Sequence, residues 1–297
     1  MTELPRGIIP AAVTPFRDGK LDREAFAFNI ERWNLTGLAG YLVLGSNGEG
    51  IFLDDEEIPL VIETAAEKRS PGKFLIAGTG RESTRRTIDL SRRAARTGAE
   101  AVLVVPPSYY RASMTDSALE HHYRAVADAS EVPVLLYHVP KFSPVNFSLT
   151  LILSLAGHPN IAGLKETSGD LPLLSAVLRD RPPSFRVYVG TGSLLLAGLV
   201  LGSDGGILAL ANAAPAECVE MARCIEAGDI ARAREIQLRL LALNQAVTAA
   251  HGVAGLKHAM NLLGSQAGTT MRPLEPLTPG AAQEVAEVVR KSGVRGA

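Results

Sequence analysis

Short apolar runs alternate along the chain with longer segments in which apolar residues recur every three or four positions. The short runs predict eight strands, at residues 7–14, 40–44, 73–77, 101–105, 132–137, 161–166, 186–190 and 205–210. The longer segments between them predict helices, and this alternation is typical of βα units built around a parallel sheet. Strands of such a sheet are covered on both faces, which explains why the run AVLVV at 101–105 is apolar throughout.

Residues at the ends of the predicted helices support the same division of the chain. Ser83 and Thr115 stand directly before periodic apolar stretches, where a side-chain oxygen can accept a hydrogen bond from a free backbone N–H group. Gly37 and Gly98 are expected to close the preceding helices, because glycine readily takes the left-handed conformation that ends many helices.

The pattern changes after the eighth predicted strand. Helical periodicity now fills four segments with no strand between them, at residues 214–227, 229–250, 253–263 and 279–292. We therefore predict an α/β fold, a (β/α)₈ TIM barrel with a C-terminal helical appendix. The barrel is expected to be the catalytic domain at residues 1–228, followed by a helical region at 229–297. The length suits this fold, since such barrels usually need roughly 250 residues.

An open, doubly wound sheet is the alternative architecture for strands that alternate with helices. It normally shows a GxGxxG turn after the first strand, but here the first predicted strand runs into TPF at 14–16. The GTG stretches at 78–80 and 190–192 each follow a predicted strand without continuing into that motif. A GxG pair on its own is more typical of a tight turn than of phosphate binding.

Composition and charge narrow the range of partners. Hydrophobic residues make up 46% of the chain and charged residues 21%, and the formal net charge is −1, which suggests no nucleic-acid partner. The chain shows no signal-peptide pattern and no uncharged run long enough to cross a bilayer, so we expect a soluble, cytoplasmic protein without a membrane partner. Cys218 and Cys224 match no metal-ligand spacing, so no metal site is expected and both are interpreted as reduced core residues.

Candidate chemistry is sought where the strands end, since the active sites of such barrels lie at the C-terminal ends of the strands. Lys165 lies inside the apolar sixth predicted strand, within GLKETSGD. One interpretation is a lysine at a fraying strand end that reaches out to water. The other is a desolvated amine, the nucleophile that attacks carbonyl groups to form an iminium and needs no metal or cofactor.

Two further features share this edge of the predicted barrel. The turn GSNGE at 45–49 has glycines that allow backbone N–H groups to converge on a carboxylate, although a plain βα turn explains the pattern as well. Glu49 is expected to support this turn internally rather than to take part in chemistry. Tyr137 ends the fifth predicted strand, so it is either a proton shuttle for a substrate on Lys165 or a packed core residue.

The remaining polar clusters have simpler interpretations. Three pairs fall in helical segments and are expected on solvated faces, namely Arg85-Arg86, Arg92-Arg93 and His121-His122. His138, next to Tyr137, stays open between a structural and a functional role.

The motifs GSNGE, PPSYY, YHVP, GLKETSGD and SDGGI occur in this order along the chain. With them the sequence resembles the dihydrodipicolinate synthase/N-acetylneuraminate lyase family of pyruvate aldolases over nearly its whole length. The resemblance implies a Schiff base between Lys165 and a 2-oxo acid such as pyruvate, with no cofactor, and Tyr137 as the catalytic tyrosine. It also implies a homotetramer, assembled as a dimer of dimers.

The same resemblance assigns the supporting residues. Ser46 matches the hydroxyl residue of the proton relay, and Ser46 and Asn47 together match the pair that binds the substrate carboxylate. Tyr109 matches the relay tyrosine that reaches into a neighbouring subunit's site. Ile207 matches a position lining the pyruvate pocket, and Thr167 is assigned to substrate binding.

Two departures from the family patterns bear on the substrate. Dihydrodipicolinate synthases carry an arginine two residues after the YNVP-like motif, where this chain has Phe142, and sialic acid lyases carry an acidic pair where it has Gly192-Ser193. The chain is most similar to 4-hydroxy-2-oxoglutarate aldolases, which share GSNGE, HHY, HPNIAGLKETSGD and ALAN. We therefore predict cleavage of 4-hydroxy-2-oxoglutarate, or a related 4-hydroxy-2-oxo acid, to pyruvate and glyoxylate.

Three alternatives remain open on the sequence. Two are Schiff-base enzymes, a 4-hydroxy-tetrahydrodipicolinate synthase that joins pyruvate to aspartate semialdehyde and an N-acetylneuraminate lyase-like aldolase or dehydratase. The third is a non-catalytic barrel that binds a 2-oxo acid, because a fold alone does not prove turnover.

Overall fold

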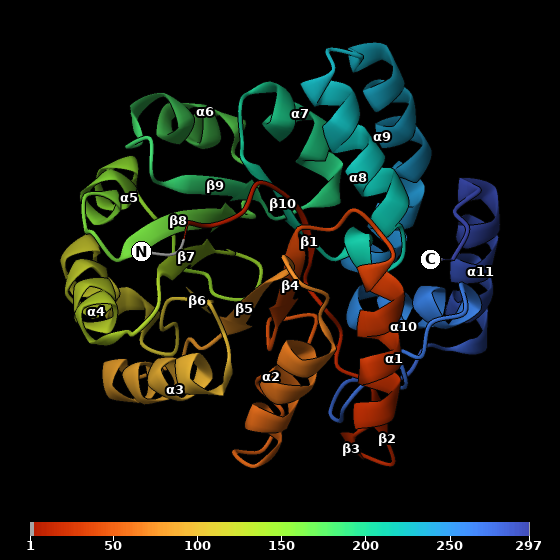
Figure 1. Ribbon diagram of the computed structural model, residues 1–297, viewed down its shortest axis with the longest axis horizontal. Coiled ribbons are helices and arrows are strands. Elements are labelled where there is room, and N and C mark those ends of the chain that lie inside the picture. The colour runs from red at the N-terminus through yellow and green to blue at the C-terminus, as the bar shows by residue number, and fades with distance from the viewer. Residues whose placement is uncertain (1–2, 297) are drawn as a thin grey trace.

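The computed structural model describes residues 3–296 and shows eight parallel strands that form a barrel (Figure 1). The strands are β1 Gly7–Pro10, β4 Gly40–Val43, β5 Phe74–Gly78, β6 Ala101–Val104, β7 Val134–His138, β8 Ile161–Glu166, β9 Arg186–Val189 and β10 Gly205–Leu208. The barrel closes between β1 and β4, where the backbone N–H of Ala12 donates to the carbonyl of Leu42 at 2.8 Å. This closure confirms the (β/α)₈ TIM barrel and excludes the open doubly wound sheet.

Each strand of the barrel is followed by a helix on the outside of the sheet (Figure 1). These helices are α1 Arg23–Asn34, α2 Glu57–Lys68, α3 Thr84–Thr97, α4 Asp116–Ala129, α5 Leu149–Ala156, α6 Leu171–Asp180, α7 Leu195–Val200 and α8 Pro215–Glu226. No helix within residues 3–296 is long and apolar enough to cross a membrane.

The helix ends follow the sequence signals in three of four places. Ser83 and Thr115 each accept a hydrogen bond from the backbone N–H three residues later, which confirms both N-caps. Gly98 ends α3 in the left-handed conformation at φ 117°, as expected. The prediction for Gly37 is wrong, because α1 ends three residues earlier and Gly37 lies in the loop. This glycine serves close packing instead, since a Cβ there would lie 2.7 Å from a methyl carbon of Val219 on α8.

The first and last predicted strands are longer than the observed ones. β1 ends at Pro10 rather than at residue 14, and the chain then forms an antiparallel hairpin of β2 Phe16–Arg17 and β3 Lys20–Leu21. Sequence analysis missed this hairpin. Its signal is Asp18-Gly19, since both residues have positive φ angles, of 53° and 73°, and this dipeptide favours such turns.

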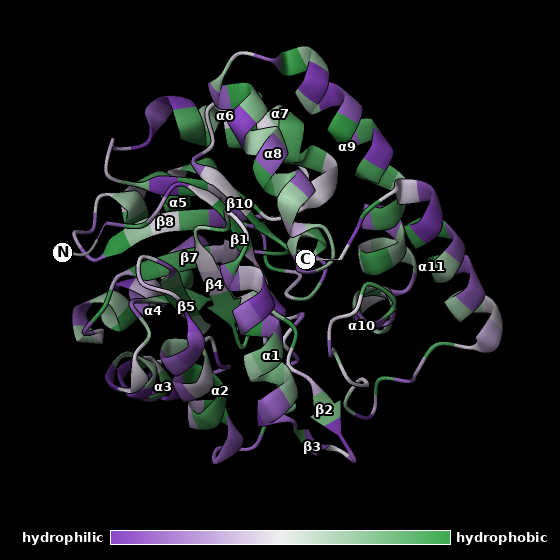
Figure 2. Ribbon diagram, turned by 45° about the vertical axis from the view of Figure 1, so that its right-hand side comes forward, coloured by the Kyte–Doolittle hydropathy of each residue, from purple (hydrophilic) through white to green (hydrophobic). Residues whose placement is uncertain are grey.

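The strand side chains divide into two buried layers. Those pointing into the barrel, such as Ile9, Leu42 and Ile207, form one apolar cluster, while those pointing outwards pack under the helices in a second. The helices show purple and green residues side by side in Figure 2, as expected where one face meets the sheet and the other meets water. A polar side chain on the inner layer therefore reaches water only near the ends of the barrel.

The C-terminal region lies beside the barrel next to α8 and α1 (Figure 1). It consists of α9 Ile230–Gln245, a π-helical turn at Ala246–Ala250, α10 Gly252–Leu262 and α11 Pro279–Ser292. The segment between α10 and α11 packs on the first barrel unit: Asn29 of α1 exchanges two hydrogen bonds of 2.8 Å with the backbone of Gln266. The region is thus helical, as expected, while the boundary at residue 228 stays a prediction.

The expectation of solvated faces holds for the arginine pairs and for His121, which are exposed, but it is wrong for His122. The His122 side chain is only 6% exposed, and its Nδ1 lies 2.9 Å from the hydroxyl oxygen of Thr84 on α3. Its Nε2 is buried without a hydrogen-bond partner within residues 3–296. Burial lowers the pKa of His122 from 6.5 to about 4, because a charged imidazolium is poorly solvated between α3 and α4.

We expect His122 to make the protein less stable as the pH falls. The unfolded chain takes up a proton near pH 6.5 and the folded chain only near pH 4, so the free energy of unfolding should drop by about 2 kcal/mol between pH 7 and pH 5. Urea unfolding at both pH values should show this drop in the wild type and in the His121→Gln control. In His122→Gln it should be largely absent, and an equal drop in all three proteins would contradict the assignment.

Candidate active site

Lys165 and Tyr137 meet inside the barrel at the C-terminal ends of two adjacent strands. They are direct register partners across β7 and β8, so their side chains leave the sheet on the same face. The Lys165 side chain is 3% exposed, which excludes the lysine that reaches out to water. Its Nζ lies 4.3 Å from the centre of the Tyr137 ring, and Tyr137 is buried as well. The structure therefore brings together the two residues on which the sequence prediction depends.

Two other predicted substrate contacts lie on a nearby strand or directly after one. Ile207 of β10 is fully buried in the same inner cluster as Tyr137. Thr167 lies one residue beyond β8, where its backbone N–H still donates to the carbonyl of His138 at 3.0 Å, so the alternation of the strand directs its side chain to the same side as that of Lys165. The Thr167 hydroxyl is buried with no partner within residues 3–296, and a Cβ at Gly190 would lie only 1.9 Å from it. Gly190 thus leaves room for a hydroxyl group that has no protein partner.

The loop after β4 carries Ser46 and Asn47 at the mouth of the barrel. Neither side chain forms a hydrogen bond within the described part of the chain, and the N–H groups of Ser46, Asn47 and Gly48 donate to no acceptor there. Both residues are half-buried, so their polar groups remain open to a bound molecule. Convergent N–H, hydroxyl and amide donors of this kind suit a carboxylate.

Glycines and two left-handed residues hold this loop in an unusual conformation. Leu44 and Glu49 have φ angles of 59° and 51°, which residues with a side chain seldom adopt. A Cβ at Gly50 would lie 2.4 Å from the carbonyl oxygen of Leu44, and one at Gly78 would lie 2.5 Å from the same oxygen. The loop therefore folds tightly on its own start and against the end of β5.

Support for this loop comes from the far end of the sequence. Glu49 is 1% exposed and pairs with Lys257 of α10 at 2.5 Å, while its other oxygen accepts a hydrogen bond of 2.7 Å from the backbone N–H of Met271. Glu49 was expected to support the turn internally, but its partners belong to the C-terminal region. Sequence analysis gave no role to Lys257, although a lysine in the apolar periodic stretch GVAGLKHAM is the signal that could have found it.

His138 lies one residue beyond Tyr137 and on the opposite face of β7. Its Nδ1 is 2.7 Å from a carboxylate oxygen of Glu166, and its ring stacks on Phe147 with 5.2 Å between the ring centres. Both His138 and Glu166 are buried. His138 therefore has a structural role. Its contact with Glu166 joins β7 to β8 on the outer side of the barrel, on the face opposite Tyr137 and Lys165.

Tyr109 is a predicted site residue that the described part of this chain does not bring to Lys165 and Tyr137. Its side chain is 80% exposed in the loop after β6 and packs edge to face on Tyr110. Its backbone N–H donates to a carboxylate oxygen of Glu82 at 2.9 Å, which fixes the loop. No contact within residues 3–296 joins Tyr109 to Lys165 or Tyr137.

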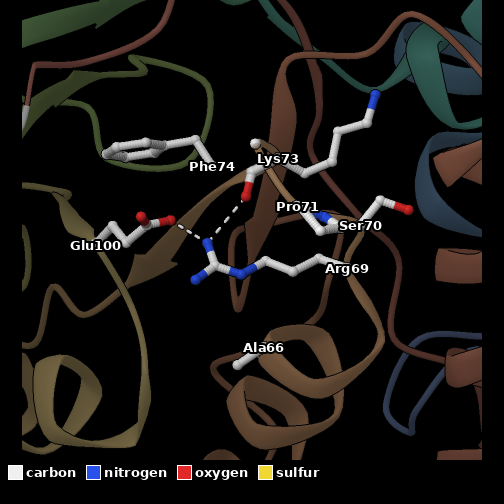
Figure 3. A pocket seen from close by; sticks show the side chains of 8 residues that line it. Ala66, Arg69, Ser70, Pro71, Lys73, Phe74 and Glu100 are labelled. Carbon is white, nitrogen blue, oxygen red and sulfur yellow. Dashed lines mark hydrogen bonds and ion pairs between the residues drawn. The ribbon is translucent and has the colours of Figure 1, made fainter.

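A cavity of about 250 Å³ lies at the opposite end of the barrel, where β5 begins (Figure 3). Arg69 and Glu100 face each other across it and form an ion pair, and Arg69 also donates to the carbonyl of Lys73 at 2.9 Å. The Lys73 amine in turn donates to the carbonyls of Thr36 and Leu38. The charges of this cavity are thus already satisfied, and it lies away from the strand ends where barrel chemistry occurs.

No group of three histidine, cysteine, aspartate or glutamate side chains within residues 3–296 is arranged to hold a metal ion. Cys218 and Cys224 are both free thiols, and Cys218 is fully buried. Burial raises the pKa of the Cys218 thiol well above its usual range, so it stays protonated.

Comparisons with known proteins show the family to which this chain belongs. The model of the dihydrodipicolinate synthetase family matches residues 4–292. A 4-hydroxy-tetrahydrodipicolinate synthase from an Exiguobacterium species is 35% identical over 276 residues, which cover 93% of this chain and 94% of the relative. The relative thus has the name of the synthase that the sequence left open as an alternative to a 4-hydroxy-2-oxoglutarate aldolase.

Solved structures show the same fold. Dihydrodipicolinate synthase from Aquifex aeolicus is 32% identical, with a TM-score of 0.92 and coverage of 97% of this chain and 98% of that one. The chloride-inhibited enzyme from Acinetobacter baumannii complexed with pyruvate is 30% identical, with a TM-score of 0.93 and coverage of 98% and 100%. The chain therefore belongs to the dihydrodipicolinate synthetase family, and with it to the carbon–carbon lyases.

Proposed function

We propose that this protein is a class I aldolase in which Lys165 forms a Schiff base with a 2-oxo acid, with pyruvate as the donor portion. The observation that carries the proposal is the surroundings of Lys165. Its amine is buried beside the ring of Tyr137 and forms no ion pair within residues 3–296. A lysine that served only to balance a buried charge would have a carboxylate partner, as Lys257 has.

The arrangement supports a complete reaction. The amine of Lys165 attacks the C2 carbonyl, water leaves, and the resulting protonated iminium draws electrons from the C3–C4 bond. Tyr137 gives its phenolic proton to the hydroxyl group that leaves as water, and its phenolate then accepts the proton of the C4 hydroxyl as the C3–C4 bond breaks, which releases an aldehyde and leaves an enamine on Lys165. Protonation at C3 and hydrolysis then release pyruvate. Ser46 passes protons to Tyr137, and Ser46 and Asn47 bind the carboxylate. Because the iminium on Lys165 accepts the electrons of the broken bond, the reaction needs no cofactor.

Borohydride reduction in the presence of pyruvate should trap a covalent adduct on Lys165, because the reagent converts the imine to a stable secondary amine. Lys165→Ala should give no adduct, and peptide mass mapping will locate the modified residue in the wild type. Tyr137→Phe should retain the adduct but lose turnover by roughly 10²- to 10⁴-fold, since only proton transfer is impaired. A folded wild-type protein without an adduct on Lys165 would contradict the mechanism and favour a non-catalytic barrel.

The second substrate has two candidates. The name shared by the relatives favours condensation of pyruvate with aspartate semialdehyde. One observation favours cleavage of 4-hydroxy-2-oxoglutarate to pyruvate and glyoxylate instead. Phe142 stands where family synthases carry the arginine that binds the second carboxylate, and it is 54% exposed. The neighbouring Lys141 is directed elsewhere, because its amine donates to the carbonyl of Thr248 at 2.9 Å.

A direct comparison of substrates separates these candidates. We expect pyruvate release from 4-hydroxy-2-oxoglutarate and little or none from N-acetylneuraminate, because the loop at Gly192-Ser193 carries no acidic side chain for sugar hydroxyls. Condensation of pyruvate with aspartate semialdehyde should be weak and should increase in Phe142→Arg, with Phe142→Leu as the control. Efficient condensation by the wild type, without cleavage of 4-hydroxy-2-oxoglutarate, would assign the chain to the synthases.

The exposed Tyr109 supports assembly into a homotetramer in which a neighbouring subunit completes the proton relay. A mixture of two inactive variants tests this arrangement, because Lys165→Ala subunits carry an intact Tyr109 and Tyr109→Phe subunits an intact Lys165. Subunit exchange should restore activity to the mixture, measured as pyruvate release, since some sites then combine both intact residues. Full activity of Tyr109→Phe alone, or no recovery after verified exchange, would rule out the shared site.

A further inference from the structure

Lys257 is a buried cation whose hydrogen bonds connect three distant parts of the chain. It is 2% exposed, and its Nζ lies 2.5 Å from a carboxylate oxygen of Glu49. The same amine donates to the carbonyls of Thr14, after β1, and of Thr269, in the C-terminal segment, both at 2.7 Å. It also lies 4.4 Å from the centre of the Phe16 ring. The ammonium group therefore joins the first barrel unit, the loop after β4 and the C-terminal region.

These contacts converge on the turn that carries Ser46 and Asn47. Glu49 is the residue through which Lys257 and the N–H of Met271 hold the end of the turn. The Thr14 hydroxyl donates to the carbonyl of Gly48 at 2.7 Å, while the Thr14 carbonyl is bound by Lys257. Two consecutive residues of the turn are thus fixed by one buried network.

The backbone of the turn needs such support. Glu49 adopts a left-handed conformation that glycine would adopt more easily, and strained residues of this kind persist only where the surroundings hold them. A glycine at this position would relieve the strain but would leave Lys257 without its carboxylate. The chain instead has a charged side chain at the strained position, directly after the residues that face the barrel mouth.

We propose that Lys257 and Glu49 are positioning residues for the 2-oxo acid, because their buried ion pair holds the Ser46–Asn47 turn in the conformation that binds the substrate carboxylate. This inference rests on the proposed Schiff-base function. It makes α10 and the segment after it part of the frame of the active site. Lys257 itself touches no substrate, so its effect on binding is transmitted through Glu49 and Thr14.

The test measures the pyruvate concentration that gives half-maximal borohydride trapping on Lys165, together with the maximal trapped fraction and the melting temperature. In Glu49→Gln, half-maximal trapping should require roughly 10- to 100-fold more pyruvate, since small misplacements of binding groups have effects of this size. The maximal trapped fraction should stay near that of the wild type. Burial lowers the pKa of Lys257, so its amine can lose its proton when the carboxylate is removed, and the variant should fold.

Asp204→Asn is the matched control at the opposite end of the barrel. Asp204 is also a buried carboxylate, paired with Arg181 and Arg186 and accepting the N–H of Val187 at 2.9 Å. Changing this carboxylate to an amide should lower the melting temperature of the protein. It should not change the pyruvate concentration that gives half-maximal trapping. A Glu49→Gln variant that melts lower but traps at the wild-type pyruvate concentration would overturn the proposal and leave the pair a purely structural one.

Two further variants keep the test decisive. Thr14→Val removes only the hydroxyl that holds Gly48, so half-maximal trapping should again require more pyruvate, even if Glu49→Gln fails to fold. The double variant Glu49→Gln/Lys257→Met buries no charge and should melt higher than Lys257→Met while still binding pyruvate poorly. If both variants reach half-maximal trapping at the wild-type pyruvate concentration, the proposal is overturned. A wild type without any adduct would overturn the proposed function itself.

Discussion

The closure of the parallel sheet between β1 and β4 is the constraint on which the rest of the structure depends. Once the Ala12–Leu42 hydrogen bond joins the two edges, the side chains of the eight barrel strands point either into the barrel or towards the helices. The mouth of the barrel is then the one end at which inner polar groups meet the βα loops. Tyr137 and Lys165 meet there because of strand register, so loop changes can alter the second substrate without moving this pair.

Close backbone packing shapes the loop that carries Ser46 and Asn47. The carbonyl oxygen of Leu44 is approached by two glycines, Gly50 and Gly78, at positions where any Cβ would overlap it. The loop is thereby pressed between its own beginning and the next strand, and Leu44 and Glu49 take up left-handed conformations. Such strain is characteristic of functional loops, because a relaxed turn would direct its N–H groups elsewhere.

The buried charges of the protein divide into two kinds. Three buried carboxylates have partners on other segments: Glu49 has Lys257, Glu166 has a ring nitrogen of His138, and Asp204 has Arg181 and Arg186. Lys165 differs from them, since its amine forms no ion pair within residues 3–296 and lies over the ring of Tyr137. A buried amine without a carboxylate partner contributes little to the stability of the fold. The surroundings of Lys165, unlike those of Lys257, are therefore those expected of a nucleophile.

The sequence by itself determined the barrel, the order of its units, and the residues at the strand ends. Apolar runs and helix signals are local, and the period of the side chains fixes which face each one takes. The sequence therefore placed Lys165, Tyr137 and the turn at 45–49 on one edge of the barrel. The hairpin after β1 escaped notice because its strands have only two residues each.

Only the tertiary structure decided which charges are paired and with what. Lys257 and Glu49 are separated by about two thirds of the chain, and no periodicity links one buried lysine to one buried carboxylate. His122 was expected on a solvated face for the same reason, since its burial depends on how α4 packs against α3. Local patterns fix the direction of a side chain, whereas its partner and its access to water depend on segments that only folding brings together.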